Sequence, residues 1–109
     1  MKIIYLGYYI HDFNNVINGK MAIENGMTTR TGSPENTGAL FNFDQLDEDF
    51  VHINQMMKFF KYGFGKATDE ACELIRLGHM TRSEAIKIVD KIDGQCHESY
   101  IELFCKYLG

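Results

Sequence analysis

The sequence lacks the cysteine pattern that disulfide-stapled and zinc-binding proteins use. Its three cysteines, Cys72, Cys96 and Cys105, include no CxxC pair. Cys96 stands next to His97, but no second pair follows at a metal-ligand spacing. We therefore expect no metal site. An odd number of cysteines without a signal peptide favours reduced thiols and a cytoplasmic protein.

Positive charge and long apolar runs are also scarce. Eleven Lys and Arg residues stand against fifteen Asp and Glu residues, which gives a formal net charge of −4. Nucleic-acid binders usually carry an excess of basic residues for the phosphate backbone, so we expect no nucleic-acid partner. The apolar run over residues 1–10 is too short to span a membrane and leads directly into His11 and Asp12, so we expect no membrane partner.

Common nucleotide-binding and catalytic motifs are missing as well. The chain has no GxxxxGK(S/T) loop, no GxGxxG and no HExxH. Its densest group of carboxylates, at residues 44 and 47–49, is expected to be a solvated helix start, with a general acid/base pair or a magnesium ligand set as the alternative. The 109 residues are expected to form one domain, residues 1–109, which is too small for a large two-substrate enzyme. We expect no catalytic residue in this chain.

What the sequence does contain predicts a mostly α-helical fold with one N-terminal β-strand. Residues 2–10 are rich in β-branched and aromatic side chains without strict alternation, which is typical of a strand buried on both faces. Residues 16–25 predict a short helix, and residues 27–43, rich in Thr, Gly, Ser and Asn, predict a long loop. The remainder, residues 45–109, predicts a helical bundle.

The helix signals in the bundle come from apolar spacing and from capping residues. One helix is predicted from apolar residues that recur every three or four positions: Leu46, Phe50, Ile53, Met57 and Phe60. His52 is expected at the boundary of that apolar stripe, with a general base as the alternative. Thr68 is expected to cap the next helix, and Thr81 with Glu84 forms a capping box for the third. A last helix is expected from about Glu98.

A single strand followed by helices needs an explanation, because a buried strand requires neighbours. The arrangement is what remains when the final strand of an α/β domain is kept and the earlier strands are removed, so we expect a fragment of a larger α/β protein. The alternative is a complete, small, mostly helical domain. The unpaired strand of a fragment would drive self-association and give a homo-oligomer, whereas a complete domain could be monomeric.

A glycine-bearing basic turn is the strongest candidate binding site. Flexible backbone, cations and a helix N-terminus together suit an anion. The candidate substrate- or phosphate-binding residues are Lys61, Gly63, Gly65, Lys66, Thr68 and Asp69, with Arg30 of the long loop. The alternative is that the glycines only turn the chain between two helices. Aromatic residues interleave with lysines at 58–66, as in single-stranded nucleic-acid binders, but core packing is the better interpretation.

The region from Asp44 to Gly94 contains a distinctive series of residues: the nine residues Lys61–Asp69, followed by Ile75, Arg76, Gly78 and the run from Met80 to Ile86. This region resembles the C-terminal region of the N-acetyl sugar amidotransferases. That family carries a pattern close to K-F/Y-G-F/Y-G-R/K-A-T-D, then a helix that ends I-R-x-G, then a capped M-T-R-x-E-A-I helix. Residues 5–10 are also similar to the family segment that precedes this region. The resemblance covers nearly the whole chain.

The resemblance implies a role in bacterial lipopolysaccharide and O-antigen biosynthesis. These proteins are ATP-dependent, pyrophosphatase-loop α/β enzymes that are thought to convert an acetamido group on an activated sugar into an acetamidino group. ATP is used with Mg, and a glutaminase partner supplies ammonia. The chain departs from the family in lacking its SGGxDS ATP loop and its upstream cysteine pairs, and it has Lys66 where the family often has Arg.

Two functions therefore remain open. The first is a C-terminal fragment or subunit of such an amidotransferase, inactive alone, with no cofactor of its own, and dependent on an upstream ATP-binding half or partner chain. The second is a stand-alone helical module for protein interaction or oligomerisation, without catalysis.

Overall fold

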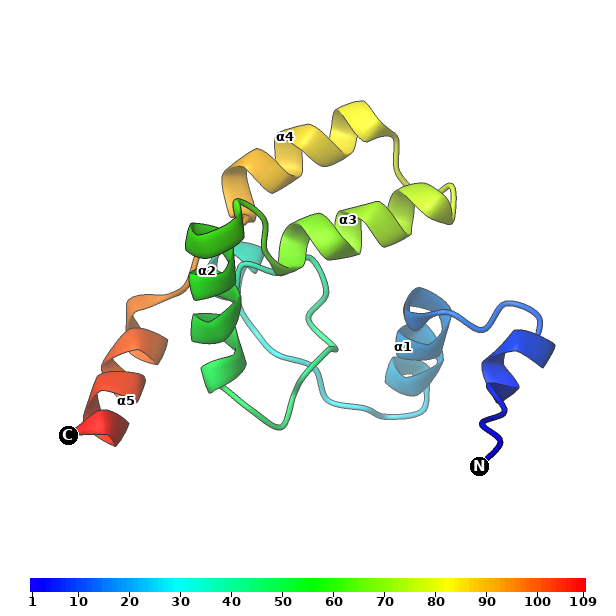
Figure 1. Cartoon of the computed structure of the whole chain (residues 1–109), viewed down its shortest axis with the longest axis horizontal. Coiled ribbons are helices and arrows are strands. Elements are labelled where there is room, and N and C mark those ends of the chain that lie inside the picture. Colours follow the sequence, from blue (N-terminus) through cyan, green and yellow to red (C-terminus); the bar gives the residue numbers. More distant parts are fainter.

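The computed structural model describes residues 1–109, and all of its regular elements are helices (Figure 1). The helices are α1 (Asn15–Glu24), α2 (Phe50–Tyr62), α3 (Lys66–Arg76), α4 (Arg82–Ile92) and α5 (Glu98–Leu108), with short 3-10 helices η1 (Leu6–Tyr9) and η2 (Pro34–Asn36). Helix α3 packs against α4, and α2 packs against α5. The predicted helical bundle is thus confirmed. None of these helices has the length and apolar character needed to cross a bilayer.

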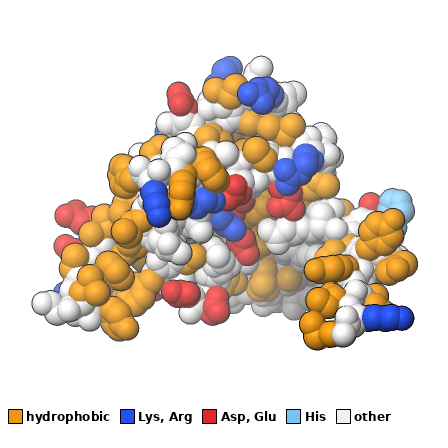
Figure 2. All heavy atoms as spheres, viewed as in Figure 1, with side chains coloured by type: hydrophobic (Ala, Val, Ile, Leu, Met, Phe, Trp, Pro, Cys, Tyr) orange, Lys and Arg blue, Asp and Glu red, His pale blue; other side chains and the backbone are white.

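The predicted strand over residues 2–10 is wrong. The chain has no regular structure before η1, and Ile3 and Tyr8 are 65% and 86% exposed. A strand needs a neighbour to satisfy its N–H and C=O groups, and the structure contains no second strand. Apolar side chains therefore gather on the outside of this N-terminal segment, around the N-terminus in Figure 2.

Local capping sets the start of two helices, and the sequence predicts the second of these caps. Asn14 precedes α1, and its side-chain oxygen accepts a hydrogen bond of 2.9 Å from the N–H of Ile17. The predicted capping box before α4 is confirmed: Thr81 N–H donates to Glu84 Oε2 at 2.8 Å, and Glu84 N–H donates to the Thr81 hydroxyl. These signals depend only on residues a few positions apart.

The helix predicted from Leu46 begins four residues later, at Phe50. Residues 44–49 form bends and turns instead, and Gln45 has a left-handed backbone with φ of 52°. Asp44 and Asp49 in this segment form ion pairs with distant cations, which holds it away from the helix axis. The rest of the predicted apolar stripe is only partly buried, because Ile53 is inside whereas Phe60 is 75% exposed.

The turn between α2 and α3 is fixed by a buried carboxylate from the end of α4. Asp93 Oδ2 accepts hydrogen bonds from the Gly65 N–H at 2.9 Å and from the Thr68 hydroxyl at 2.5 Å. Thr68 is therefore not the N-cap of α3, because the helix begins at Lys66 and Gly65 precedes it. A Cβ atom on Gly65 would stand 2.6 Å from Asp93 Oδ1, so the position needs glycine.

The core that these contacts surround is small. Twelve of the 109 residues are buried, and no large side chain is completely enclosed. Ala67 and Ala71 of α3 and Ala85 of α4 are buried, and α3 packs against α4. The radius of gyration is 15.6 Å, compared with about 13 Å for a compact domain of this length. Polar contacts between the elements therefore contribute much of the stability of this arrangement.

Replacing Asp93 with alanine should weaken the fold markedly. The change leaves the buried Gly65 N–H without a partner and breaks the link between α4 and α3, so the free energy of unfolding should fall by about 2–3 kcal/mol. Urea unfolding followed by circular dichroism measures this. Asp90→Ala on the exposed face of α4 is the matched control and should change the free energy by less than about 0.5 kcal/mol. Equal effects of the two substitutions would contradict the assignment.

Candidate functional site

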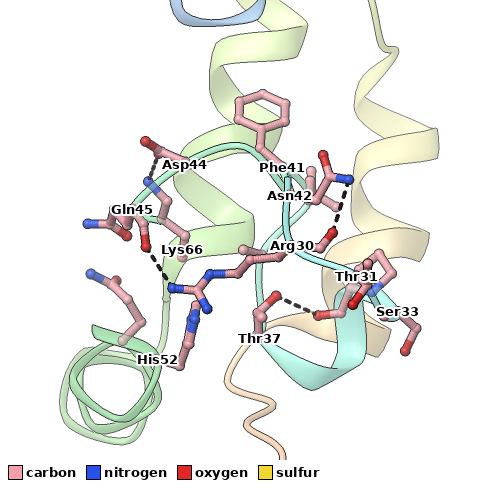
Figure 3. Close-up of a pocket in the computed structure, with 15 residues that line it drawn as sticks. Arg30, Thr31, Ser33, Thr37, Phe41, Asn42, Asp44, Gln45, His52 and Lys66 are labelled. Atoms are coloured by element: carbon pink, nitrogen blue, oxygen red, sulfur yellow. Dashed lines mark hydrogen bonds and ion pairs between the residues drawn. The ribbon is translucent and has the colours of Figure 1, made fainter. Parts of the chain in front are cut away.

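A pocket of about 320 Å³ lies where the long loop crosses the start of α3 and the first two turns of α2 (Figure 3). Its walls are residues 30–34, 37, 39–42, 44 and 45 of the loop, His52 and Gln55 of α2, and Lys66 of α3. Only three of the fifteen lining residues are hydrophobic, whereas most ligand pockets are largely apolar. The pocket is therefore suited to a polar ligand.

Arg30 holds the two ends of the long loop together. Its guanidinium donates to Asp49 Oδ1 at 2.7 Å and to the backbone oxygens of Gln45 and Glu48 at 2.8 and 3.0 Å. The backbone N–H of Arg30 also donates to the Asn42 carbonyl at 2.9 Å. One guanidinium atom, Nε, is buried and has no hydrogen-bond partner.

Lys66 forms the second charged contact in the pocket. Its Nζ lies 2.5 Å from Asp44 Oδ2 and 3.6 Å from Glu70 Oε1. Burial alone would lower the pKa of Lys66, but the hydrogen bond from Lys66 to Asp44 and the negative charges of both carboxylates outweigh it and raise that pKa. Lys66 therefore stays protonated, and its charge is balanced by the chain's own acids.

Glu70 anchors the loop to α3 from below the pocket. Only 3% of this residue is exposed, and its Oε2 accepts from the backbone N–H groups of Leu40 at 2.6 Å and Phe41 at 3.2 Å. Burial raises its pKa from 4.5 to about 7, while the two N–H donors and the Lys66 charge oppose that rise. Glu70 therefore keeps its proton to a higher pH than an exposed glutamate does.

His52 is buried beside Arg30, not at the core boundary where the sequence places it. Its exposed fraction is 5%, and its ring centroid lies 4.7 Å from that of Tyr100. Burial, followed by the positive charge of Arg30, lowers the pKa of His52, so the ring is neutral at pH 7. Its Nε2 atom has no hydrogen-bond partner, and neither has Oε1 of Gln55 one turn further along α2.

The structure brings only two of the seven predicted binding residues into this pocket: Arg30 and Lys66. The others are engaged elsewhere. Gly63 ends α2 in a left-handed conformation, and Gly65 and Thr68 donate to Asp93. Asp69 pairs with Lys58 at 2.6 Å, and Lys61 lies over the Tyr62 ring at 5.1 Å.

The acidic segment predicted as a solvated helix start also has a different place. Asp44 and Asp49 balance the two cations of the pocket, and the segment precedes α2 instead of opening it. No group of three or more His, Cys, Asp or Glu side chains is close enough to hold a metal ion. His52 and Gln55 are the site residues that sequence reasoning missed, and their three-residue spacing on one helix is the only signal that could have linked them.

Comparison with known proteins gives one match. The family described as "LPS biosynthesis protein WbpG-like, C-terminal domain" matches residues 35–109. The matched range includes α2 to α5 and the pocket residues His52, Gln55 and Lys66, but it begins after Arg30. No curated protein and no solved structure matches the chain.

The raised pKa of Glu70 predicts that stability falls as the pH rises. Between about pH 4.5 and 7 the folded chain keeps the Glu70 proton while the unfolded chain has released it, so the free energy of unfolding decreases over that range and levels off above it. Glu70→Gln removes this titration and keeps an oxygen for the Leu40 and Phe41 N–H groups. From about pH 4 to about pH 8, wild type should lose about 2–3 kcal/mol more than the variant in urea unfolding. Parallel pH profiles would contradict the assignment.

Proposed function

The chain belongs to the family of WbpG-like lipopolysaccharide biosynthesis proteins, and we propose that it supplies the sugar-binding part of an ATP-dependent N-acetyl sugar amidotransferase. In the proposed reaction the acetamido oxygen of an activated sugar attacks the α-phosphorus of ATP and pyrophosphate leaves. Ammonia then attacks the activated carbon, and AMP leaves with the former amide oxygen. The sugar gains an acetamidino group.

The polar lining of the pocket is the observation that carries this proposal. Hydroxyl or amide side chains come from several parts of the long loop and from α2: Thr31, Ser33, Thr37, Asn42, Gln45 and Gln55. Groups of this kind both donate and accept hydrogen bonds, as the hydroxyls of a sugar do. Ala39, Leu40 and Phe41 are the hydrophobic residues of the lining. A volume of about 320 Å³ lies at the lower end of the range for ligand pockets and suits a single sugar ring.

Lys66 is positioned to meet the diphosphate of a sugar nucleotide at the edge of the pocket. Its ammonium is paired with Asp44, so a diphosphate would exchange with that carboxylate. ATP with Mg would be held by an ATP-binding half, in the same chain or a separate one, because the SGGxDS loop is absent here. A glutaminase partner would supply ammonia. The turn around Lys61, Gly63 and Asp69 remains a second candidate for the diphosphate. A substitution of Lys61 distinguishes the two sites, because Lys61 belongs only to the turn.

A second function, docking of a protein partner, is favoured by the N-terminal segment. Its large apolar side chains are mostly exposed: Ile3, Ile4, Tyr5, Leu6, Tyr8, Tyr9 and Ile10. Exposed apolar patches of this kind mark interaction sites. The matched family domain is a C-terminal one, so we propose that this segment packs against the ATP-binding half. The two functions are compatible.

Isothermal titration with UDP-N-acetylglucosamine as the probe tests the pocket. Lys66→Ala should weaken binding about tenfold or more, because it removes a charge-assisted contact to the diphosphate. Asp44→Asn breaks the same ion pair but leaves the Lys66 ammonium free, so binding of the probe should be kept or strengthened. The free energy of unfolding should fall in both Lys66→Ala and Asp44→Asn, because each loses the ion pair. Lys61→Ala should bind as wild type does. A loss of affinity in Lys61→Ala but not in Lys66→Ala would show that the diphosphate binds at the turn between α2 and α3 instead.

Activity tests the whole proposal. The chain is mixed with the ATP-binding half of a family member, UDP-N-acetylglucosamine, ammonium and Mg-ATP, and AMP and the acetamidino sugar are followed by mass spectrometry. We expect AMP formation only when both polypeptides are present. AMP formation by the ATP-binding half alone, at an equal rate, would exclude a role for this chain.

Light scattering on the same mixture tests the docking segment. Ile4→Ser with Tyr8→Ser should abolish complex formation without changing the circular dichroism, because both side chains are exposed and add nothing to the core. Lys2→Ser is the matched control at an exposed polar position and should leave the complex intact. A different result would identify a second copy of this chain as the partner. In that case the chain self-associates, it forms no complex with the ATP-binding half, and the double substitution removes the self-association.

A further inference from the structure

We propose that residues 44–49 form a strap that an anionic ligand of the pocket releases, and that the released strap becomes the first turn of a longer α2. The inference rests on the proposed function, because the diphosphate placed at Lys66 is the ligand that would release the strap.

Two cations of the pocket hold the strap in place. Lys66 Nζ lies 2.5 Å from Asp44 Oδ2 at one end of the strap. Arg30 Nη1 lies 2.7 Å from Asp49 Oδ1 at the other end. Figure 3 shows both cations, with Lys66 directed toward Asp44 and Arg30 toward the backbone of Gln45. Because Arg30 and Lys66 also line the pocket, an anionic ligand there competes with the carboxylates of the strap for the same partners.

Few other contacts fix the strap. Residues 45–49 are all exposed, and no backbone N–H group of residues 44–49 donates to another backbone oxygen. Gln45 has a left-handed backbone, with φ of 52°, which costs free energy in a residue that carries a side chain. Ion pairs near the surface stabilise a conformation only slightly, so the loss of both pairs to a ligand is enough to free the segment.

The sequence of the strap favours a helix. Leu46 stands four residues before Phe50 and seven before Ile53, which is the spacing of one helix face. The acidic residues 47–49 would lie in the first turn, where the unpaired N–H groups stabilise carboxylates. Asp49 already has helical dihedral angles, with φ of −88° and ψ of −29°. The segment therefore has two conformations available, one held by the cations and one favoured by its own sequence.

Arg30 occupies the acceptors that a longer α2 needs. In an α-helix each carbonyl accepts from the N–H group four residues later. The Gln45 carbonyl would therefore accept from Asp49. The Glu48 carbonyl would accept from His52. In the structure the Arg30 guanidinium donates to these two carbonyls instead, at 2.8 and 3.0 Å, and the His52 N–H donates to Asp49 O at 3.3 Å. Movement of Arg30 toward a ligand would free both acceptors at once.

Nuclear magnetic resonance of the chain labelled with carbon-13 and nitrogen-15 tests the two conformations. UDP-N-acetylglucosamine should shift the Cα resonances of residues 45–48 to helical values and slow the hydrogen exchange of the His52 amide, because the helix gains a turn. N-acetylglucosamine, which has no phosphate, is the control and should leave these resonances unchanged.

A double substitution tests the release without a ligand. Asp44→Asn with Asp49→Asn removes both anchoring carboxylates, so residues 45–48 should be helical in the free chain. The probe should bind at least about fivefold more tightly, because the strap no longer competes with it. Asp47→Asn with Glu48→Gln is the matched control: it removes the same charge from the strap, but neither side chain forms an ion pair. It should change the affinity by less than about twofold.

A pair of substitutions outside the pocket lining tests the coupling between helix formation and binding. Glycine is less favourable than alanine in a helix, so Glu48→Gly should bind UDP-N-acetylglucosamine about three- to fivefold more weakly than Glu48→Ala. The same pair of substitutions at Asp90, on the exposed face of α4, should give equal affinities.

The outcomes separate the strap from the proposed function. Binding of UDP-N-acetylglucosamine without a helical shift at residues 45–48 overturns the strap and leaves the proposed function standing. Absence of binding overturns both. A helical shift caused by N-acetylglucosamine alone overturns the release by charge. Equal affinities of Glu48→Gly and Glu48→Ala overturn the coupling between the helix and the ligand.

Discussion

The buried carboxylate of Glu70 is the contact on which the pocket depends. It receives the Leu40 and Phe41 N–H groups, so a loop with few apolar residues of its own is fixed to α3. Arg30 closes the same loop from its other end through Asp49. Because so few side chains are buried, these polar anchors determine where the loop runs. A site built in this way responds to pH through Glu70, whose pKa lies near neutrality.

Local signals explain which parts of the fold could be predicted from the sequence. The capping box of Thr81 and Glu84 involves residues three apart, and it was predicted correctly. Thr68 carries the same kind of hydroxyl, but its partner Asp93 is 25 residues away, so a cap was predicted where a tertiary hydrogen bond exists. The strand over residues 2–10 was predicted from β-propensity, which gives no information about whether a neighbouring strand is present. His52 was misplaced because spacing alone cannot show that the loop covers it.

Family membership and pocket chemistry support the same function from different directions. The family match indicates a role in lipopolysaccharide biosynthesis, and it rests on a region that includes α2 to α5. The proposed sugar site rests on the polar lining of the pocket, much of which comes from the long loop, and part of that loop lies before the matched range. The formal net charge of −4 agrees with a local arrangement in which each pocket cation is balanced by an acid, so the pocket has no surplus positive charge.

The central claim, that this pocket binds the sugar, is tested most directly by nuclear magnetic resonance. A chain labelled with nitrogen-15 is titrated with UDP-N-acetylglucosamine, and the backbone amides, the Arg30 Nε–H and the His52 ring are followed. We predict shifts at the Leu40 and Phe41 amides, at Arg30 Nε and at His52, because these groups line or support the pocket. Shifts confined to residues 61–69, or no shifts under saturating probe, would contradict the claim.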